Sequence, residues 1–404
     1  MALLPVSEAQ DKLLDKACAV NEIEMVALHE ADGRVLAEDL VALLTQPPFD
    51  ASAMDGYALR AQDASQIGAV LPVIGTSAAG RAFEGAVGQG QTVRIFTGAP
   101  VPEGADTVLI QEDAEVLDGG RIRTSFVPIK GRHIRPRGQD FTEGEAILEA
   151  GTVLDYTRLT VAAAMNHATV PVLRRPRVAV LATGDELLPP GSALGPSQII
   201  ASNSFGIAAL ARVSGAEVID FGIVPDDSDK IAAAIDQARA AKPDVIVTLG
   251  GASVGDLDLV RSTLLSKGME LDFWKIAMRP GKPLMVGNLG GIHVLGLPGN
   301  PVSSLVCALL FLEPLICKLA NRPLPARSAM ACTSTDLPAN DQRQDYLRAT
   351  LARRADGNLV ATSYGKQDSS MMKIFARSDC LIVRPPQAPA IPAGGPCPVL
   401  LLRP

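Results

Sequence analysis

Acidic side chains follow apolar runs of strand length in the middle of the chain. Glu186 and Asp226 each lie two residues beyond such a run, and Asp258 follows a third run and its glycine-rich loop. Crowded carboxylates repel one another unless a cation joins them, and hard oxygen ligands select Mg²⁺ or a similar ion. Asp226, Asp227 and Asp256 could instead be helix caps, an interpretation that we favour for Asp227. Glu186 and Asp258 have no obvious capping role, which favours a functional site.

The glycine-rich loop after the third run is suited to phosphate. Glycines let backbone N–H groups approach a ligand closely, and a helix that follows adds the positive end of its dipole. The residues that would line this site are Gly250, Gly251, Ser253 and Gly255. The loop lacks the GxxxxGK[ST] pattern of a P-loop and the GxGxxG of a dinucleotide fold, which argues against an ordinary NTPase or NAD enzyme.

Cations gather in a later loop. Arg279 and Lys282 flank the turn in the segment RPGKP, and Lys275 lies just upstream. Arginine offers a two-pronged fork and lysine a point charge, a pairing suited to phosphate or a tetrahedral oxyanion. A solvated turn explains these residues equally well when the loop is taken in isolation. The next loop, GLPGNP, places Asn300 as a helix cap and Pro301 at the first helical position. The lone Trp274 is interpreted as a packing residue.

Strands and helices alternate around these loops, so a single sheet can position them. The predicted strands are 178–184, 217–224, 244–250 and 292–298, apolar runs typical of strands covered on both faces. Helices are expected between them, one capped by Asn203 and the next by Ser228. This alternation predicts a parallel sheet with right-handed crossovers, and ligands sit outside the carboxyl ends of such strands.

The remaining sequence predicts three further domains, so the fold class is multidomain α/β plus β. Residues 47–139 are rich in Gly, Pro and β-branched residues and form a β-rich domain. Residues 1–46 and 140–176 form a discontinuous linking domain, because neither segment alone is large enough for a core. Its first helix opens on a capping box of Ser7 and Gln10. Residues 177–322 form the α/β domain, and residues 323–404 form a small C-terminal β-barrel or sandwich.

The bulk composition excludes several classes of protein. A net charge of −7 argues against a nucleic-acid partner, because phosphate backbones are held by pooled Lys and Arg. The N-terminus lacks a basic region before an apolar run, and the six cysteines show no CxxC, which predicts a cytoplasmic protein with free thiols. The most apolar stretch, 301–320, contains Glu313 and Lys318, so we expect a core helix or a subunit interface and no membrane span.

Eight motifs together resemble the molybdopterin molybdenumtransferase family, the MoeA-type enzymes related to the E domain of gephyrin. They are PPFDASAMDGYALR, RIFTGAPVPEGADTV, ATGDEL, SNS, GIVPDD, GGASVGDLD, WKIAMRPGKP and GLPGNPVS. They follow one another over nearly the whole chain, and only the part after about residue 323 matches weakly. Each motif alone is weak, but eight in order are highly specific.

The resemblance implies a fold and a reaction. Its fold has four subdomains, with an adenylyltransferase-like α/β domain and an elongated linking domain. The protein would be a homodimer, in which the α/β domain of one protomer faces the β-rich domain of the other. In that family the substrate is adenylylated molybdopterin, and the enzyme uses Mg²⁺ to exchange the adenylate for molybdate. The products are molybdenum cofactor and AMP.

The resemblance also assigns roles to residues. The facing domain would contribute Asp55 and Thr97. The acidic side, holding metal or substrate, would be Glu186, Asp226 and Asp258. The basic side, holding molybdate or phosphate, would be Lys275, Arg279 and Lys282, with Pro298 and Pro301 shaping the adjacent loop. Cleavage of a phosphoanhydride calls for a metal clamp and for cations on the developing charge. Arg279 departs from the family, because many members carry Lys there, and its planar fork would hold an oxyanion differently.

Two other functions stay open at this stage. The α/β domain could carry out the preceding adenylylation of molybdopterin, because the related adenylyltransferases share the GGxSxG-type loop. The extra domains and GLPGNP favour the transferase. A non-catalytic pterin-binding scaffold, with a dimer surface for a partner, is the second, and the intact acidic and basic loops argue against it. The molybdopterin adenylyltransferase is also a candidate partner of this chain.

Overall fold

The computed structural model describes residues 3–250 and 259–403, and the chain divides into two compact units. The first unit comprises residues 1–24, 33–35 and 173–404, and the second comprises residues 25–32 and 36–172. Strands β1 (Ile23–Ala27) and β12 (Thr169–Leu173) each run from one unit into the other. Each unit has hydrophobic cores of its own.

A six-stranded sheet lies at the centre of the first unit. Its order is β16 (Glu217–Val224), β13 (Arg177–Thr183), β17 (Val245–Leu249), β21 (Ile292–Leu297), β20 (Pro283–Leu289) and β18 (Glu270–Lys275). The first four strands are parallel, whereas β20 runs antiparallel to both β21 and β18. The mostly parallel sheet is therefore confirmed. The apolar runs predict its parallel strands to within one residue at each end, but they do not predict β18 and β20.

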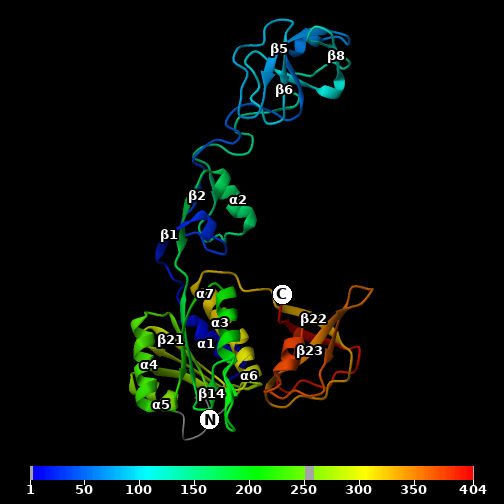
Figure 1. Cartoon of the computed structure of the whole chain (residues 1–404). Helices are drawn as coiled ribbons and strands as arrows, with labels where there is room; N and C mark the ends of the chain where they lie inside the picture. The colour runs from blue at the N-terminus through cyan, green and yellow to red at the C-terminus, as the bar shows by residue number, and fades with distance from the viewer. Residues whose placement is uncertain (1–2, 251–258, 404) are drawn as a thin grey trace. The chain divides into compact units, whose positions relative to one another are not determined.

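Helices cover both faces of this sheet, because its strands are apolar on both sides. Along β13, Val178 and Val180 join one core, while Ala179 and Leu181 join the other. The helices over the first core are α1 (Val6–Asp15), α3 (Asn203–Val213), α6 (Pro301–Cys307) and α7 (Glu313–Leu319). Those over the second core are α4 (Ser228–Ala240) and α5 (Leu259–Ser266). Figure 1 shows α4 and α5 on one side of the sheet and α3 and α6 on the other.

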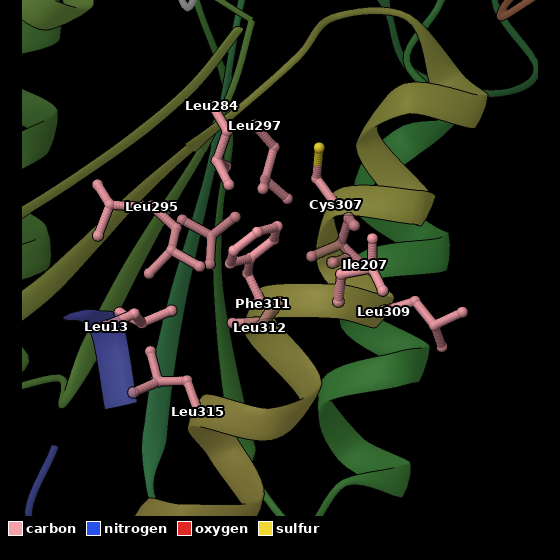
Figure 2. Close-up of a cluster of buried hydrophobic side chains, with 14 of the residues drawn as sticks. Leu13, Ile207, Leu284, Leu295, Leu297, Cys307, Leu309, Phe311, Leu312 and Leu315 are labelled. Carbon is pink, nitrogen blue, oxygen red and sulfur yellow. The ribbon is translucent and has the colours of Figure 1, made fainter. Parts of the chain in front are cut away.

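A long apolar helical run covers the first core. It passes from α6 through the π-helical segment η4 (Ala308–Leu312) into α7. By length and composition alone this run could cross a membrane, but 83% of its most apolar window is buried within the fold. Figure 2 shows Phe311 of η4 directed toward Leu284 and Leu297 of the sheet. The run is therefore a core helix, one of the two interpretations that its sequence allows.

A closed five-stranded barrel forms the C-terminal part of the first unit. Its strands are β22 (Ser328–Thr333), β23 (Gln344–Arg353), β24 (Leu359–Ser363), β25 (Cys380–Arg384) and β26 (Pro396–Leu401). They are ordered β23, β24, β22, β26 and β25, and a further pairing of β25 with β23 closes the ring. The C-terminal region is thus a barrel and not a sandwich. Helix α8 (Met372–Arg377) precedes β25, and the two-residue strand β19 (Met278–Arg279) pairs with β23.

A six-stranded mixed sheet dominates the second unit. Its order is β7 (Thr107–Ile110), β4 (Gly56–Leu59), β6 (Thr92–Ile95), β5 (Val70–Ser77), β9 (Arg121–Thr124) and β8 (Ala114–Leu117). A separate core includes helix α2 (Tyr156–Ala164) and residues of the first of two short ladders. The ladders are β2 (Leu40–Val41) with β11 (Ala146–Leu148), and β3 (Ala51–Ser52) with β10 (Ile134–Arg135). The domain boundaries drawn from the sequence within both units stay predictions.

Short elements complete the two units. In the first they are β14 (Leu187–Leu188) and β15 (Ile199–Ile200), which pair in parallel just after β13. In the second they are the 3₁₀ turns η1 (Leu28–Glu30), η2 (Ala61–Ala64) and η3 (Gln111–Asp113).

Three helix starts differ from the sequence prediction. Helix α1 begins at Val6, so Ser7 lies inside the helix and is not its cap. Ser228 is the first residue of α4, and the cap is Asp227, whose carboxylate accepts from the N–H groups of Asp229 and Lys230 at 3.0 Å each. Asn203 is likewise the first residue of α3 and not its cap. The interpretation of Asp227 as a helix cap is confirmed.

Candidate active site

Acidic residues from two loops meet at the carboxyl edge of the sheet. Strands β13 and β16 are neighbours whose ends, Thr183 and Val224, are paired. The turns after these strands are joined by a hydrogen bond of 3.1 Å from the Asp226 N–H to Asp185 Oδ1. Glu186 lies in the same turn as Asp185. The structure therefore brings Glu186 and Asp226 into one group of carboxylates, and it adds Asp185 to them.

The charges of this group act on Asp226. Partial desolvation raises the pKa of the Asp226 carboxyl, and the negative charges of Asp185 and Glu186 raise it further. Such crowding favours a bound cation, and carboxylate oxygens are ligands that Mg²⁺ prefers. Within residues 3–250 and 259–403, no group of three or more His, Cys, Asp or Glu side chains is placed to hold a metal ion. The predicted third ligand, Asp258, lies outside the described residues.

Gly250 begins the glycine-rich loop close to the acidic turns. Its φ is +92°, and a Cβ at this position would lie 2.7 Å from the carbonyl oxygen of Thr183, so only glycine fits. Its N–H donates to the Leu297 carbonyl at 3.3 Å, which places it beside the end of β21. The other predicted ligands of this loop, Gly251, Ser253 and Gly255, lie outside the described residues.

The GLPGNP loop lies at the same edge. Pro298 is buried, and Pro301 is the first residue of α6, as the sequence predicts. A Cβ on Gly299 would lie 3.9 Å from the Cα of Gly250, so this loop is the neighbour of the glycine-rich loop. Asn203 Nδ2 donates to the Gly299 carbonyl at 2.8 Å. The side chain predicted to cap α3 therefore fixes the GLPGNP loop instead.

The predicted cations lie in the loop after β18. Because β18 and β21 both run antiparallel to β20, the carboxyl end of β18 is at the same sheet edge as the acidic turns. Lys275 is the last residue of β18, and its Nζ lies 4.6 Å from the centroid of the Trp274 ring. Ile276 N–H donates to the Lys282 carbonyl at 3.1 Å and closes the loop. Trp274 packs on the core under α4 and α5, which confirms its interpretation as a packing residue.

Arg279 is paired with two acids of the C-terminal barrel. Its Nη2 donates to Asp345 Oδ2, and its Nη1 donates to Asp341 Oδ2 at 3.3 Å. The hydrogen bond to Asp345 is the main cause that raises the pKa of Arg279. Lys282, like Arg279, is exposed. No sequence motif points to either acid, because both lie in the region where the family motifs fade.

Asp55 and Thr97 form a hydrogen-bonded pair in the second unit. The backbone N–H and the hydroxyl of Thr97 donate to Asp55 Oδ1 at 2.7 and 2.8 Å. These two bonds, in that order, lower the pKa of Asp55, and the charge of Arg94 lowers it further. Asp55 is therefore ionised at neutral pH. The structure thus joins two residues that are far apart in sequence and that the family resemblance assigns to the same site.

Arg94 lies near this pair, and no sequence pattern assigns it a role. Its guanidinium carbon lies 4.9 Å from the ring centroids of both Tyr57 and Phe96. Its Nη1 donates to the Gly56 carbonyl at 3.1 Å. Stacking on two rings holds the cation beside Asp55. Tyr57 and Arg94 are Cα partners across β4 and β6, so no local sequence pattern connects them.

The acidic turns, the start of the glycine-rich loop and the basic loop lie along one carboxyl edge, where α/β domains bind their ligands. The class of this domain is that of molybdopterin-binding domains, because residues 179–318 match the family described as a probable molybdopterin binding domain. Residues 4–166 match the MoeA N-terminal region (domain I and II), and residues 331–402 match the MoeA C-terminal region (domain IV).

Similar proteins extend these matches to the full length. The chain is 36% identical to the molybdopterin molybdenumtransferase of Haemophilus influenzae over 97% of both chains. It is 38% identical to molybdopterin molybdenumtransferase 2 of Mycobacterium tuberculosis, over 91% of this chain and 92% of that one. A crystal structure of the molybdopterin biosynthesis MoeA protein from Pyrococcus horikoshii matches over 100% of both chains, with a TM-score of 0.83 and 29% identity. The chain belongs to the molybdopterin molybdenumtransferase (MoeA) family.

Proposed function

We propose that this chain is a molybdopterin molybdenumtransferase that inserts molybdate into adenylylated molybdopterin, forms molybdenum cofactor and releases AMP. Membership of the family over the full length supports this function. The observation that carries it is the separation of charge along the carboxyl edge of the sheet. Carboxylates follow β13 and β16 at one end of the sheet order, and cations follow β18 at the other. The reaction requires both ends, because carboxylates can hold a metal ion at the adenylate leaving group and cations can bind the incoming oxyanion.

The acidic end would hold Mg²⁺. Glu186 and Asp226 supply hard oxygen ligands, and Asp258 is the third ligand that the family resemblance implies. Desolvation raises the pKa of Asp226, and repulsion by Asp185 and Glu186 raises it further; a cation at this place would relieve that repulsion. When bound, the ion neutralises charge on the phosphate oxygens. The backbone N–H groups of the loop that starts at Gly250 would bind the phosphate next to it.

The basic end would bind the oxyanion. Lys275 ends β18, and Arg279 and Lys282 lie in the segment after it, which the backbone hydrogen bond from Ile276 to Lys282 closes. The side chains of these three residues would bind and orient molybdate from this frame. The neighbouring GLPGNP loop would complete the wall of the site, and Pro298 and Pro301 restrict its backbone. Because these groups act by position and charge, the reaction needs no covalent nucleophile from the protein.

We also propose that the working form is a cytoplasmic homodimer with shared active clefts. Asp55 and Thr97 of one copy would face the α/β domain of the other. The exposure of Thr97, the hydrogen bonds between the two residues and the lowered pKa of Asp55 suit a carboxylate that is ionised and ready for a ligand. The molybdopterin adenylyltransferase is the proposed supplier of the substrate.

Release of AMP is the direct test of the reaction. Purified protein given adenylylated molybdopterin, molybdate and Mg²⁺ should release AMP, and omission of molybdate or Mg²⁺ should slow this release strongly. Glu186→Gln should reduce the rate by on the order of 100-fold without loss of thermal stability. The matched control is Glu217→Gln. Glu217 lies at the amino end of β16, away from the carboxyl edge of the sheet, so this variant should retain wild-type activity.

Other outcomes of the assay would identify a different function. If the protein consumes ATP with molybdopterin alone, it is an adenylyltransferase. If it binds the pterin tightly and releases no AMP, it is a binding scaffold. Unfolding of Glu186→Gln, with activity lost only for that reason, would assign Glu186 a structural role.

A further inference from the structure

Backbone pairing places Arg279 opposite an acid of the barrel. Strand β19 joins the barrel in parallel with β23, so that Met278 and Arg279 are the Cα partners of Gln344 and Asp345. Gln344 N–H also donates to the Ala277 carbonyl at 2.8 Å. Paired strands keep their backbones at a fixed spacing, so the position of Arg279 relative to Asp345 is set before their side chains meet.

The two charged partners differ in burial. Asp345 is 4% exposed, whereas the side chain of Arg279 is 47% exposed. The second carboxylate oxygen of Asp345, Oδ1, is buried and has no hydrogen-bond partner among the residues that the structure describes. Burial of a carboxylate costs desolvation energy, and one ion pair with an exposed partner offsets little of it. Such a pair therefore stabilises the fold little or not at all. The arrangement therefore calls for a function other than stability.

A pocket beside the pair gives the guanidinium room to turn. It has a volume of about 370 Å³, and Arg279, Asp345, Leu347 and Gln367 are among the residues that line it. Gln367 uses its amide to hold Arg348, so it does not anchor Arg279. The hydrogen bond to Asp345 is thus what keeps the fork in one orientation, with help from the exposed Asp341.

We propose that Asp345 is a positioning residue, which holds the guanidinium of Arg279 so that its remaining N–H groups point at the bound oxyanion. This inference rests on the function proposed above. A guanidinium carries several N–H donors in a rigid plane, so anchoring one edge fixes the direction of the others. An ammonium at this position would have no such plane. Asp345 therefore matters to oxyanion binding only because this chain carries Arg at position 279.

The test is the dependence of AMP release on molybdate concentration in the full-length protein. Asp345→Asn should raise the KM for molybdate about tenfold, the loss expected for one charge-assisted hydrogen bond, and leave kcat within about twofold. Asp345→Glu keeps the charge on a longer side chain and should give an intermediate KM. The matched control is Asp379→Asn, a barrel carboxylate that accepts from Leu351 N–H and pairs with Arg403, and its KM should equal that of the wild type.

Coupling to Arg279 separates positioning from a general structural effect. In an Arg279→Lys background, Asp345→Asn should change the KM by less than about twofold, because the lysine has no fork to orient. The proposal is overturned if the KM of Asp345→Asn and Asp345→Glu equals that of the wild type, or if it rises as much in the Lys background. Calorimetric titration of the wild type with molybdate alone distinguishes failure of the role proposed for Asp345 from failure of the proposed function. A wild type that neither binds molybdate nor releases AMP contradicts the proposed function itself.

Discussion

Asp226 and Asp227 are neighbours in sequence with opposite relations to the fold. The carboxylate of Asp227 accepts two N–H groups at the start of α4, so its charge is satisfied by the helix. Partial desolvation raises the pKa of the Asp226 carboxyl, and the negative charges of Asp185 and Glu186 raise it further. A raised pKa means that the charged form is less favourable in the folded state than in the unfolded state. Asp226 thus lowers the stability of the protein at neutral pH, as groups of an active site often do.

Replacement of Asp226 should therefore stabilise the protein. Asp226→Asn removes the repulsion and should raise the free energy of unfolding at neutral pH by up to about 1 kcal/mol, because an exposed charge is partly screened. Between the ordinary value of 3.8 and the raised pKa, the folded state binds more protons than the unfolded state, so wild-type stability falls as the pH rises. The gain should shrink as the pH falls toward 3.8. Urea unfolding across that range measures it.

The adjacent cap provides the contrast for this experiment. Asp227→Ala should lose about 1 kcal/mol of stability, because the helix loses its N-cap. Added Mg²⁺ should stabilise the wild type more than Asp226→Asn, since the ion relieves the same repulsion. A loss of stability in Asp226→Asn would mean that this carboxylate supports the fold and would remove the physical argument for a cation there.

Single residues could be assigned from the sequence only where a local rule applies to them. Asp227 precedes a helix in a capping position, and the rule for caps identifies it correctly. Asp345 is the second residue of the barrel strand β23, and its partner Arg279 is 66 residues away in sequence. No local pattern connects them, because their contact is created by the parallel pairing of β19 with β23. Their ion pair therefore becomes visible only in the three-dimensional structure.

At the scale of elements, the apolar strands were predictable and the mixed sheet edge was not. The parallel strands are buried on both faces, so each is a continuous apolar run. Strand β18 has exposed and half-buried positions, which weakens its pattern. The antiparallel turn between β20 and β21 did leave a signal, Gly290 and Gly291. Their φ values of 62° and 93° fit a two-residue hairpin turn. These two glycines are thus a sequence signal for the change of direction between β20 and β21.

The basic loop depends on close packing at Gly281. Its φ is +108°, and a Cβ there would lie 2.5 Å from the sulfur of the buried Cys307. Gly281→Ala should therefore lower the free energy of unfolding by about 2 to 4 kcal/mol, through steric overlap and an unfavourable backbone conformation. Cys307→Ala removes the nearest atom of the overlap. The double variant should be more stable than the sum of the two single losses predicts, by more than about 1 kcal/mol. Additive losses in denaturant unfolding would contradict this packing.

At the scale of the whole molecule, the pairing of strands that are far apart in sequence cannot be predicted from local patterns. The barrel closes because β23 pairs with β25, and the intervening chain includes β24 and α8. Short strands with Pro and Gly turns predict a barrel and a sandwich equally, and only this pairing decides between them. The same limit applies to assembly. The sequence of one chain does not place Asp55 and Thr97 relative to the acidic edge of another copy. The shared cleft therefore needs a test that reports on assembly directly.

Mixed dimers of two inactive variants provide that test. Asp55→Asn removes a group of the second unit, and Glu186→Gln removes one of the first. If each cleft combines the second unit of one copy with the first unit of the other, a mixed dimer has one cleft with both defects and one intact cleft. Random pairing in co-expressed protein makes half of the dimers mixed, so AMP release should return to about a quarter of the wild-type rate. Light scattering should give twice the mass of the chain. If each cleft is formed within a single chain, every cleft in the mixture carries a defect and the activity stays at the level of the separate variants.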